Sequence, residues 1–375
     1  MPIERRKSRV VHKGSVPIGG DAPIAVQSMT TTHTDDLGAT VAQIHALEAL
    51  GCEIIRVAVP HRGAAEAIAE IKPRIHIPLI ADIHFSHRLA LAAIEAGADG
   101  IRINPGNLKK KEHVEAVVAK AAEHHIPIRI GVNSGSVRPR EQLQVAPDER
   151  ELVPLMVEQA LSYAQWFEGL GFRDIVLSVK ASDPLATVEA YRAVAAACDY
   201  PLHIGVTAAG PPEVGIIKSA IGLGILLSDG IGDTIRVSLT GPPHPEVTAA
   251  YEILAALGLR GRRSPEIISC PTCGRCEIDL VRLVGQVTEA LRDAPPWLRV
   301  AVMGCVVNGP GEARDADIGV AGGKGFGYIF RRGKLIKKVP AEELAAELLA
   351  EIRKLDQSPW PANPCHRPRQ DRRDL

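Results

Sequence analysis

Short runs of β-branched and aliphatic residues alternate with longer Ala- and Leu-rich amphipathic stretches between Pro23 and Leu257. The short runs predict strands at Ile24–Gln27, Glu53–Val59, Pro78–Ile83, Gly100–Ile103, Pro127–Val132, Asp174–Val179, Leu202–Val206 and Thr234–Leu239. The amphipathic stretches predict helices at about Thr40–Leu50, Ala64–Ile71, His87–Ala96, Lys110–His124, Leu152–Leu170, Asp183–Cys198, Gly215–Ser228 and Glu246–Leu257. An open doubly wound sheet usually has fewer strands and a Gly-rich turn after the first, which this chain lacks. The pattern therefore predicts an α/β fold, a closed (β/α)₈ or TIM barrel.

The pattern changes on both sides of this repeat. Runs at Arg9–Val11 and Val16–Ile18 predict a small hairpin that caps the bottom of the barrel, and Gly258–Pro265 is typical of a linker. Beyond it, strands and helices between Ile267 and Leu355 do not alternate regularly, which predicts a small α+β domain. We therefore expect a barrel domain at 1–258, an α+β domain at 266–356 and a disordered Pro- and Arg-rich tail at 357–375.

Composition excludes several classes of function. The 375 residues carry 44 basic and 44 acidic side chains, and this balance argues against nucleic acid or an anionic membrane as the main partner. The N-terminus lacks the apolar run of a secretory signal, and the most apolar window, Ile216–Leu227, is too short to span a bilayer. Seven cysteines in such a chain fit a reducing compartment, so we expect a cytoplasmic protein.

The cysteines near the C-terminus carry the clearest chemical signal. Cys270 and Cys273 share one tight turn, and Cys305 lies in a Gly-rich loop that ends at Glu312. A Cys-x-x-Cys pair alone also occurs in zinc knuckles and redox dithiols. The third thiol and the glycines beside it, which let backbone amides approach sulfur, favour a metal or an iron–sulfur cluster over buried structural cysteines. Cys276 offers a fourth thiol.

Cations gather at the predicted carboxyl ends of the barrel strands, where TIM barrels carry their functional residues. They are Arg56, Arg102, Arg129, Lys180 and Arg236, accompanied by Asp82, Asn133 and Ser238. Uncompensated buried charges are costly, so these cations need either a phosphorylated substrate or internal carboxylates. The sequence favours phosphate, because Asp82 is the single acid that we place inside a strand end. His84, two residues after Asp82, is open to proton transfer, substrate binding or a structural role.

Several of these stretches together carry a specific resemblance. They include Ala81–Phe85, Arg102–Asn107, Ile128–Asn133, Ser178–Ser182, Lys218–Gly224, Gly232–Ser238, Cys270–Cys273 and Gly304–Glu312. In them the chain resembles the bacterial 4-hydroxy-3-methylbut-2-enyl diphosphate synthases of the non-mevalonate isoprenoid pathway, in their two-domain form. The resemblance implies reductive ring opening and dehydration of 2-C-methyl-D-erythritol 2,4-cyclodiphosphate. It also implies a [4Fe-4S] cluster that receives single electrons from ferredoxin or flavodoxin.

The resemblance assigns roles to individual residues. It implies that Cys270, Cys273, Cys305 and the carboxylate of Glu312 hold the cluster, whereas spacing alone nominates Cys276 as the fourth ligand. We side with Glu312, because a hard carboxylate leaves iron more readily than a thiolate and so frees a site for substrate. The resemblance further implies that the strand-end cations and Ser238 hold the diphosphate. Asn308 would then hydrogen-bond a cluster sulfur or the substrate.

One position departs from the family pattern. After the seventh strand the family has Thr-Glu-Ala-Gly, and this chain has Thr207-Ala-Ala-Gly210. The missing glutamate at Ala208 leaves the proton donor open.

The predicted topology also bears on assembly. The last barrel helix ends at the bottom while the cations lie at the top, and a linker of about eight residues spans roughly 28 Å at most. We therefore expect a head-to-tail homodimer in which each cluster domain covers the partner's barrel. Two rival readings stay open: another phosphate-handling barrel whose appended domain binds structural zinc, and a non-enzymatic iron–sulfur carrier.

Overall fold

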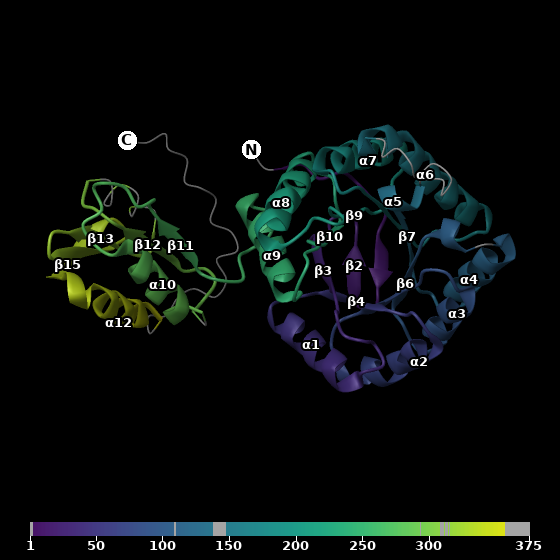
Figure 1. Cartoon of the computed structure of the whole chain (residues 1–375), viewed down its shortest axis with the longest axis horizontal. Helices are drawn as coiled ribbons and strands as arrows, with labels where there is room; N and C mark the ends of the chain where they lie inside the picture. Colours follow the sequence, from purple (N-terminus) through teal and green to yellow (C-terminus); the bar gives the residue numbers. More distant parts are fainter. Residues whose placement is uncertain are drawn as a thin grey trace. The chain divides into compact units, whose positions relative to one another are not determined.

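The computed structural model describes residues 3–108, 110–137, 148–292, 294–307, 311, 314 and 316–356 (Figure 1). The chain divides between Arg260 and Gly261 into two compact units. The predicted tail at 357–375 lies outside the described residues. No helix in the described part of the chain is long and apolar enough to cross a membrane.

The first unit is the predicted TIM barrel. Its strands are β3 (Ala25–Met29), β4 (Ile54–Ala58), β5 (Leu79–Asp82), β6 (Gly100–Ile103), β7 (Ile128–Asn133), β8 (Ile175–Lys180), β9 (His203–Ile204) and β10 (Thr234–Ile235). They pair in parallel in the order β8-β7-β6-β5-β4-β3-β10-β9, and a parallel bridge between Leu177 and Leu202 joins the two ends of this order. The prediction of a closed barrel is therefore confirmed.

Helices surround the strands in a ring (Figure 1). They are α1 (Leu37–Ala49), α2 (Arg62–Ile71), α3 (His87–Glu95), α4 (Lys111–Glu123), α6 (Val153–Gly169), α7 (Pro184–Ala197), α8 (Pro212–Ser228) and α9 (His244–Ala256). The short α5 (Ser134–Val137) and the 3-10 turns η1 (Lys72–Arg74), η2 (Pro105–Asn107) and η4 (Glu149–Leu152) were not predicted. Side chains fix the starts of several helices: the Asp36 carboxylate accepts the Ala39 N–H at α1, and Asp183 accepts the Ala186 N–H at α7.

Strand alternation separates two environments. Outward residues such as Ile55 and Val57 of β4 are fully buried against the helices, and each contributes about 1.5–3 kcal/mol to stability. Inward residues of the same strand, Ile54 and Arg56, face the barrel interior. β9 and β10 are shorter than predicted. At Gly205 the chain leaves the ladder and passes so close to the Arg236 carbonyl oxygen that a Cβ there would lie 2.5 Å from it.

A hairpin lies against the amino ends of three strands. β1 (Val11–Lys13) and β2 (Val16–Ile18) pair antiparallel, so the predicted hairpin is present, although it begins at Val11 instead of Arg9. Ile18 is fully buried against Ala25, Ile54 and Ile80, which are early inward residues of β3, β4 and β5. Figure 1 shows β2 within the ring of strands.

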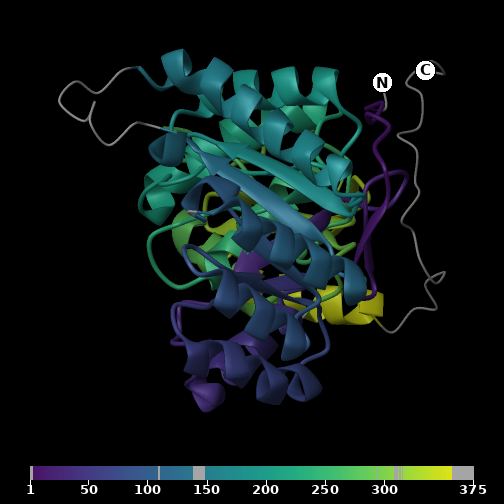
Figure 2. The same cartoon turned by 90° about the vertical axis from the view of Figure 1, so that its right-hand side faces the viewer.

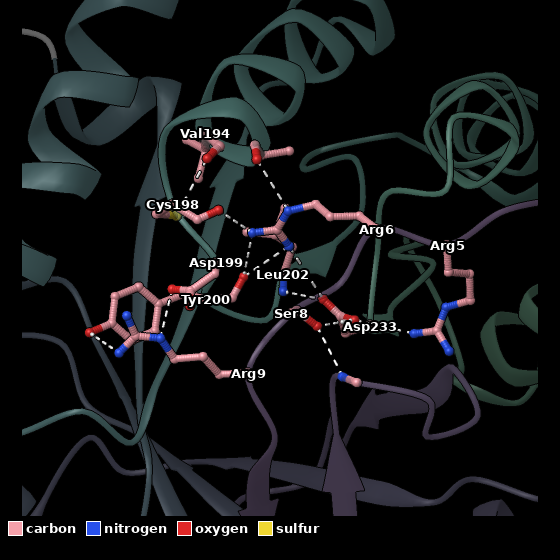
Figure 3. A network of polar contacts seen from close by, with 12 residues as sticks. Arg5, Arg6, Ser8, Arg9, Val194, Cys198, Asp199, Tyr200, Leu202 and Asp233 are labelled. Atoms are coloured by element: carbon pink, nitrogen blue, oxygen red, sulfur yellow. Dashed lines mark hydrogen bonds and ion pairs between the residues drawn. The ribbon is translucent and has the colours of Figure 1, made fainter.

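Residues Ile3–Val10 form an extended segment that we call the N-terminal strap, and Figure 2 shows it along one end of the barrel. Its contacts centre on buried Asp233, just before β10 (Figure 3). The Asp233 carboxylate accepts hydrogen bonds from Ser8 Oγ (2.8 Å) and Arg5 Nη2 (3.2 Å). Arg6 donates to the Tyr200 carbonyl oxygen from both terminal nitrogens, at 3.1 and 3.0 Å. The strap therefore ties the start of the chain to the amino ends of β9 and β10.

The second unit is built on a mixed five-stranded sheet in the order β11-β12-β13-β14-β15. The strands are β11 (Glu266–Ser269), β12 (Arg299–Met303), β13 (Ile318–Gly323), β14 (Phe326–Arg331) and β15 (Lys334–Pro340). Helices α10 (Leu280–Ala290) and α12 (Leu344–Asp356), the latter preceded by the turn η6 (Ala341–Glu343), pack against the sheet through a shared apolar core. Because β11 and β12 run parallel and adjacent, the segments after them, which carry Cys270 and Cys305, leave the sheet at the same edge.

Candidate functional site

The barrel interior brings charged residues of four neighbouring strands side by side. In the register of the sheet, Ala58 of β4 pairs with Asp82, Asp82 with Arg102, and Arg102 with Arg129. Arg56 lies two residues before Ala58 and points to the same side. Asp82, Arg102 and Arg129 are 4%, 7% and 2% exposed, so their charges lie almost entirely out of water.

Asp82 is the centre of this group. Its Oδ1 lies 3.3 Å from Arg102 Nη1, and its Oδ2 lies 3.7 Å from Arg56 Nε. His84 Nε2 lies 3.6 Å from Oδ2, while the His84 side chain is 52% exposed. Burial works against the charged carboxylate, but Arg56, His84 and Arg102 together hold the pKa of Asp82 below its usual range. Asp82 is therefore ionised, and the structure brings His84 to it as the strand pattern suggested.

A second carboxylate enters the site from a helix. Glu246, in the first turn of α9, is 3% exposed, and its oxygens lie 3.3 Å from Arg236 Nε and Nη2. It also accepts hydrogen bonds from Ser28 Oγ (3.1 Å) and the Leu239 N–H (2.9 Å). Asp82 remains the single acid inside a described barrel strand, but this glutamate brings a second internal carboxylate to the strand-end cations from a helix. A glutamate at a helix start looks like an ordinary surface residue in sequence, so nothing in the local pattern identifies this pair.

Arg129 and Lys180 differ from the other cations. Neither has a carboxylate partner among the residues that the structure describes, and both are more than nine-tenths buried. Arg129 Nη1 donates to Ser178 Oγ at 3.2 Å, while its Nε and Nη2 have no partner. Burial first, and neighbouring cations second, lower the pKa of both groups well below the usual value. The barrel interior is therefore short of negative charge, which an anionic ligand would supply.

Three further candidate positions lie at or beyond the carboxyl ends of strands. Asn133, at the end of β7, and Ser238, two residues beyond Arg236, are both partly buried. Ala208 lies four residues after the end of β9, is exposed, and has a left-handed φ of 49°. That backbone conformation is unfavourable for any residue with a Cβ, and residues held in it cluster at functional sites. The position where the family pattern has glutamate is thus a strained one.

The cysteines of the second unit follow β11 and β12 at the carboxyl ends of these two parallel strands. Cys270 Sγ accepts the Gly304 N–H at 3.2 Å, and the Cys276 N–H bonds the Cys273 carbonyl oxygen at 2.9 Å, closing a tight turn. Backbone N–H groups aimed at sulfur favour the thiolate that metals and clusters need. Hydrogen bonding by the Arg275 backbone N–H and the Arg275 side chain also lowers the pKa of Cys273.

Cys276 is held in a different way. Its Sγ donates to the Ile278 carbonyl oxygen at 3.2 Å and lies against Gly304, where an added Cβ would approach within 2.5 Å. The thiol donor set fits an iron–sulfur cluster, since thiolates are the usual cluster ligands. Asn308 and Glu312 lie outside the described residues.

Comparison with known proteins decides the family. A model described as the GcpE TIM-barrel domain matches residues 8–251, and one described as the GcpE protein C-terminal domain matches residues 266–354. The chain belongs to the GcpE family. The GcpE relatives include proteins named 4-hydroxy-3-methylbut-2-en-1-yl diphosphate synthase (flavodoxin) from Dehalococcoides mccartyi and Geobacter sulfurreducens. The first is 53% identical over 94% of this chain and 100% of its own length, and the second 54% identical over 94% and 98%.

The two GcpE matches contain the two groups of residues just described. The barrel match covers the strand-end cations with Asp82 and Glu246, and the C-terminal match covers Cys270, Cys273 and Cys305. The family resemblance found in the sequence is therefore confirmed.

Proposed function

We propose that this chain makes 4-hydroxy-3-methylbut-2-en-1-yl diphosphate from 2-C-methyl-D-erythritol 2,4-cyclodiphosphate, the reaction of the synthases that it resembles. The observation that carries the proposal is the pair of buried cations, Arg129 and Lys180, that lack a carboxylate partner in the described barrel. A chain 53% identical to the relatives over nearly its whole length is expected to keep their reaction.

The barrel cations then contribute to diphosphate binding in two different ways. Arg129 and Lys180 supply charge that no described side chain neutralises, so they bind the diphosphate most strongly. Arg56, Arg102 and Arg236 share their charge with Asp82 or Glu246, which hold each guanidinium in a fixed orientation before substrate arrives. Asn133 and Ser238 add neutral hydrogen-bonding groups at the ends of their strands.

The second unit supplies the redox group. Cys270, Cys273 and Cys305 would hold a [4Fe-4S] cluster, with Glu312 as the fourth ligand. When bound, the cluster supplies the two electrons of the reaction one at a time. The Gly304 N–H on Cys270 Sγ supports this assignment, as does the hydrogen bond that turns Cys276 Sγ towards the Ile278 carbonyl oxygen. The names of the relatives specify flavodoxin and so support it as the electron donor, with ferredoxin as the other candidate.

Loss of water from the substrate requires a proton at the departing oxygen. His84 is suited to deliver it, because its ring is half exposed to solvent and its Nε2 is oriented by ionised Asp82. Asn308, beside Cys305 in sequence, is assigned to hydrogen bonding at the cluster or the substrate.

We infer a head-to-tail homodimer, in which the cluster domain of one subunit serves the barrel of the other. Arg260 belongs to the barrel, since its guanidinium pairs with Glu53 at 2.9 Å and donates to the Ile24 carbonyl oxygen at 2.6 Å. The linker between the two units is then 261–265, about 18 Å at full extension. Helix α9 alone is about 20 Å long and runs from the strand-end side to the bottom. So short a linker supports a cluster domain that serves the partner's barrel. The cytoplasmic location also stays a prediction.

Anaerobic turnover of the cyclodiphosphate with dithionite or reduced flavodoxin tests the function directly. The purified protein should be brown and contain iron and sulfide. A colourless zinc protein would support the rival barrel with a structural zinc domain, and cluster content without turnover would support the iron–sulfur carrier. Cys305→Ala should lose the cluster, Glu312→Ala should keep a cluster but lose most activity, and Cys276→Ser should keep both.

Mixing two inactive chains tests the dimer. Cys305→Ala and Arg236→Ala damage different units, so subunit exchange should restore part of the activity if each site combines both subunits. Absence of recovery, despite exchange proven by mass spectrometry, would place the whole site in one chain.

A further inference from the structure

A group of polar side chains lies inside the barrel, and we call it the lower layer because the hairpin that carries Lys13 packs on the amino ends of the strands. Lys13, Gln27, His203 and Thr234 are at most 1% exposed, and each has a side-chain nitrogen or oxygen without a hydrogen-bond partner. They come from the hairpin and from β3, β9 and β10. Buried polar groups are almost always paired with protein, water or ligand. Four unpaired groups inside the barrel, none used in the proposed reaction, therefore require a function or a set of bound waters.

Lys13 reaches this layer from below. In β1, Val11 and Lys13 are buried while His12 between them is exposed, so Lys13 lies on the barrel side of the hairpin. The same side of β2 carries Ile18, which packs on the amino ends of β3 to β5. The N-terminal hairpin thus carries an ammonium group into the barrel from the end opposite the mouth.

The surroundings of Lys13 are cationic. Arg129 of β7 and Arg56 of β4 lie close enough to act on its charge, and His203 is influenced in turn by Lys180, Arg129 and Lys13. The other groups of this layer, Gln27 and Thr234, are neutral. No carboxylate in the described part of the chain forms an ion pair with Lys13, and Arg56 and Arg102 already share Asp82. Tyr191, from α7, uses its hydroxyl to donate to the His203 carbonyl oxygen at 2.5 Å.

While the site holds no anion, these surroundings disfavour a positive charge on Lys13 and on His203. Burial, and then Arg129 and Arg56, lower the pKa of Lys13 well below its usual value. Burial, and then Lys180 and other cations, lower the pKa of His203 in the same direction. An anion bound by Arg129 and Lys180 would act on both groups in the opposite sense.

We propose that Lys13 and His203 take up protons from solvent when the anionic substrate binds, so that the lower layer of the barrel helps to neutralise the diphosphate. The proposal rests on the proposed function, because it needs the diphosphate beside Arg129 and Lys180. Each nitrogen gains one proton through its lone pair, and no other bond changes. A cyclic diphosphate carries one strongly acidic hydroxyl on each phosphorus, so the ligand itself does not titrate near neutral pH. Affinity should then increase as the pH falls between the pKa values of the bound and the free enzyme.

Calorimetric titration of the cluster-loaded enzyme with the cyclodiphosphate, anaerobically and without reductant, tests this. Binding enthalpies in buffers of different ionisation enthalpy give the number of protons taken up. We expect net uptake in the wild type, a loss of up to about one proton in Lys13→Met, and binding weakened by on the order of ten-fold at neutral pH. His203→Gln should also lower the uptake. His12→Gln, on the solvent side of the same strand, is the matched control and should change neither quantity.

Lys13→Arg covers the case in which Lys13→Met does not fold. Its guanidinium stays protonated, so it should bind substrate without taking up the proton that Lys13 takes. Equal proton uptake in the wild type and the Lys13 variants, or none in the wild type, overturns this inference and leaves the proposed function intact. A wild-type enzyme that neither binds nor turns over the cyclodiphosphate overturns the proposed function instead.

Discussion

The N-terminal strap and the barrel interior are both rich in cations, but they differ in how those cations are paired. In the strap, Arg5 pairs with Asp233 at 3.2 Å and Arg9 with Asp199 at 2.6 Å (Figure 3). Arg6 donates to backbone carbonyl oxygens, including that of Tyr200. Each arginine of the strap therefore has a carboxylate or carbonyl partner within the protein, and of Arg5 only Nε lacks one.

In the barrel interior, some of the buried cations have no carboxylate partner among the described residues. Arg129 has two unpaired nitrogens, and neither it nor Lys180 meets a carboxylate in the described part of the chain. A cation with hydrogen-bond or carboxylate partners in the protein stabilises the fold. A buried cation without a carboxylate partner lowers stability and marks the place of a ligand. The side chains of Arg5, Arg6 and Arg9 are 21%, 14% and 32% exposed, whereas Arg129 is 2% exposed. Pairing and burial together therefore separate structural from functional charge.

The largest expected effect is a change in kcat when a carboxylate is added at position 208. If Ala208 marks a missing acid–base group, Ala208→Glu should raise kcat by up to about 10²–10⁴-fold. Ala208→Gly is the matched control: it relieves the left-handed backbone without adding a carboxylate, so it should leave kcat unchanged. Steady-state kinetics of the two variants decide the point. Equal kcat in both would mean that His84 or a water supplies the proton.

Removing the Asp233 carboxylate, which the strap contacts, should affect stability alone. Asp233→Ala leaves Arg5 and Ser8 without their partner and should lower the free energy of unfolding by about 3–5 kcal/mol. Denaturant unfolding measures this loss, and kcat/KM of the folded protein should stay at the wild-type value. A large kinetic effect would show that the strap acts on the site. Asp21→Ala, at an exposed position, is the control and should change neither quantity.

Removing a buried cation that lacks a carboxylate partner should have the opposite effect, lowering activity and leaving stability unchanged or higher. Arg129→Met deletes a diphosphate contact worth about 1.5–3 kcal/mol, which corresponds to roughly ten- to a hundred-fold in kcat/KM. The free energy of unfolding should be unchanged or higher, because an apolar side chain replaces a buried charge without a carboxylate partner. Kinetics and denaturant unfolding on one preparation test both statements. Loss of stability without a change in kcat/KM would show that Arg129 stabilises the fold and does not bind substrate.

The smallest effect is expected at a surface pair. Arg192 and Asp229 approach within 2.7 Å, but their side chains are 52% and 36% exposed. Water screens such a pair, so Arg192→Met should change the free energy of unfolding by less than about 1 kcal/mol and leave turnover unchanged. A loss as large as that of Asp233→Ala would mean that distance, and not burial, determines the strength of these pairs.

Much of the barrel could be predicted from sequence, because alternation and helix periodicity are local properties. The strands and helices occur in the expected order, and the early inward positions of β4 and β5 could be derived from period two alone. The partners of the strand-end cations could not be predicted. Glu246 reaches Arg236 from another element, and sequence spacing says nothing about such a contact.

Lys13 was missed for a related reason. The alternation of Val11, His12 and Lys13 shows that one side of the hairpin is buried, but a lysine normally marks the solvent side. Only the position of the hairpin under the strands shows that Lys13 faces the interior. The cysteine motif, in contrast, could be recognised in sequence because its ligands lie close together along the chain. The roles of Glu312 and Asn308 stay predictions.

The strap also sets the order in which the molecule can be completed during synthesis. The Arg6 N–H bonds the carbonyl oxygen of Gly230, and Arg5 meets Asp233 across a separation of 228 positions. The strap contacts therefore cannot form until the segment before β10, the last strand of the barrel, has been synthesised. Contacts of such long sequence separation form late and slowly. Until then Arg5 and Arg6 remain accessible, so a nascent barrel is open at its bottom to chaperones and proteases that a finished one excludes.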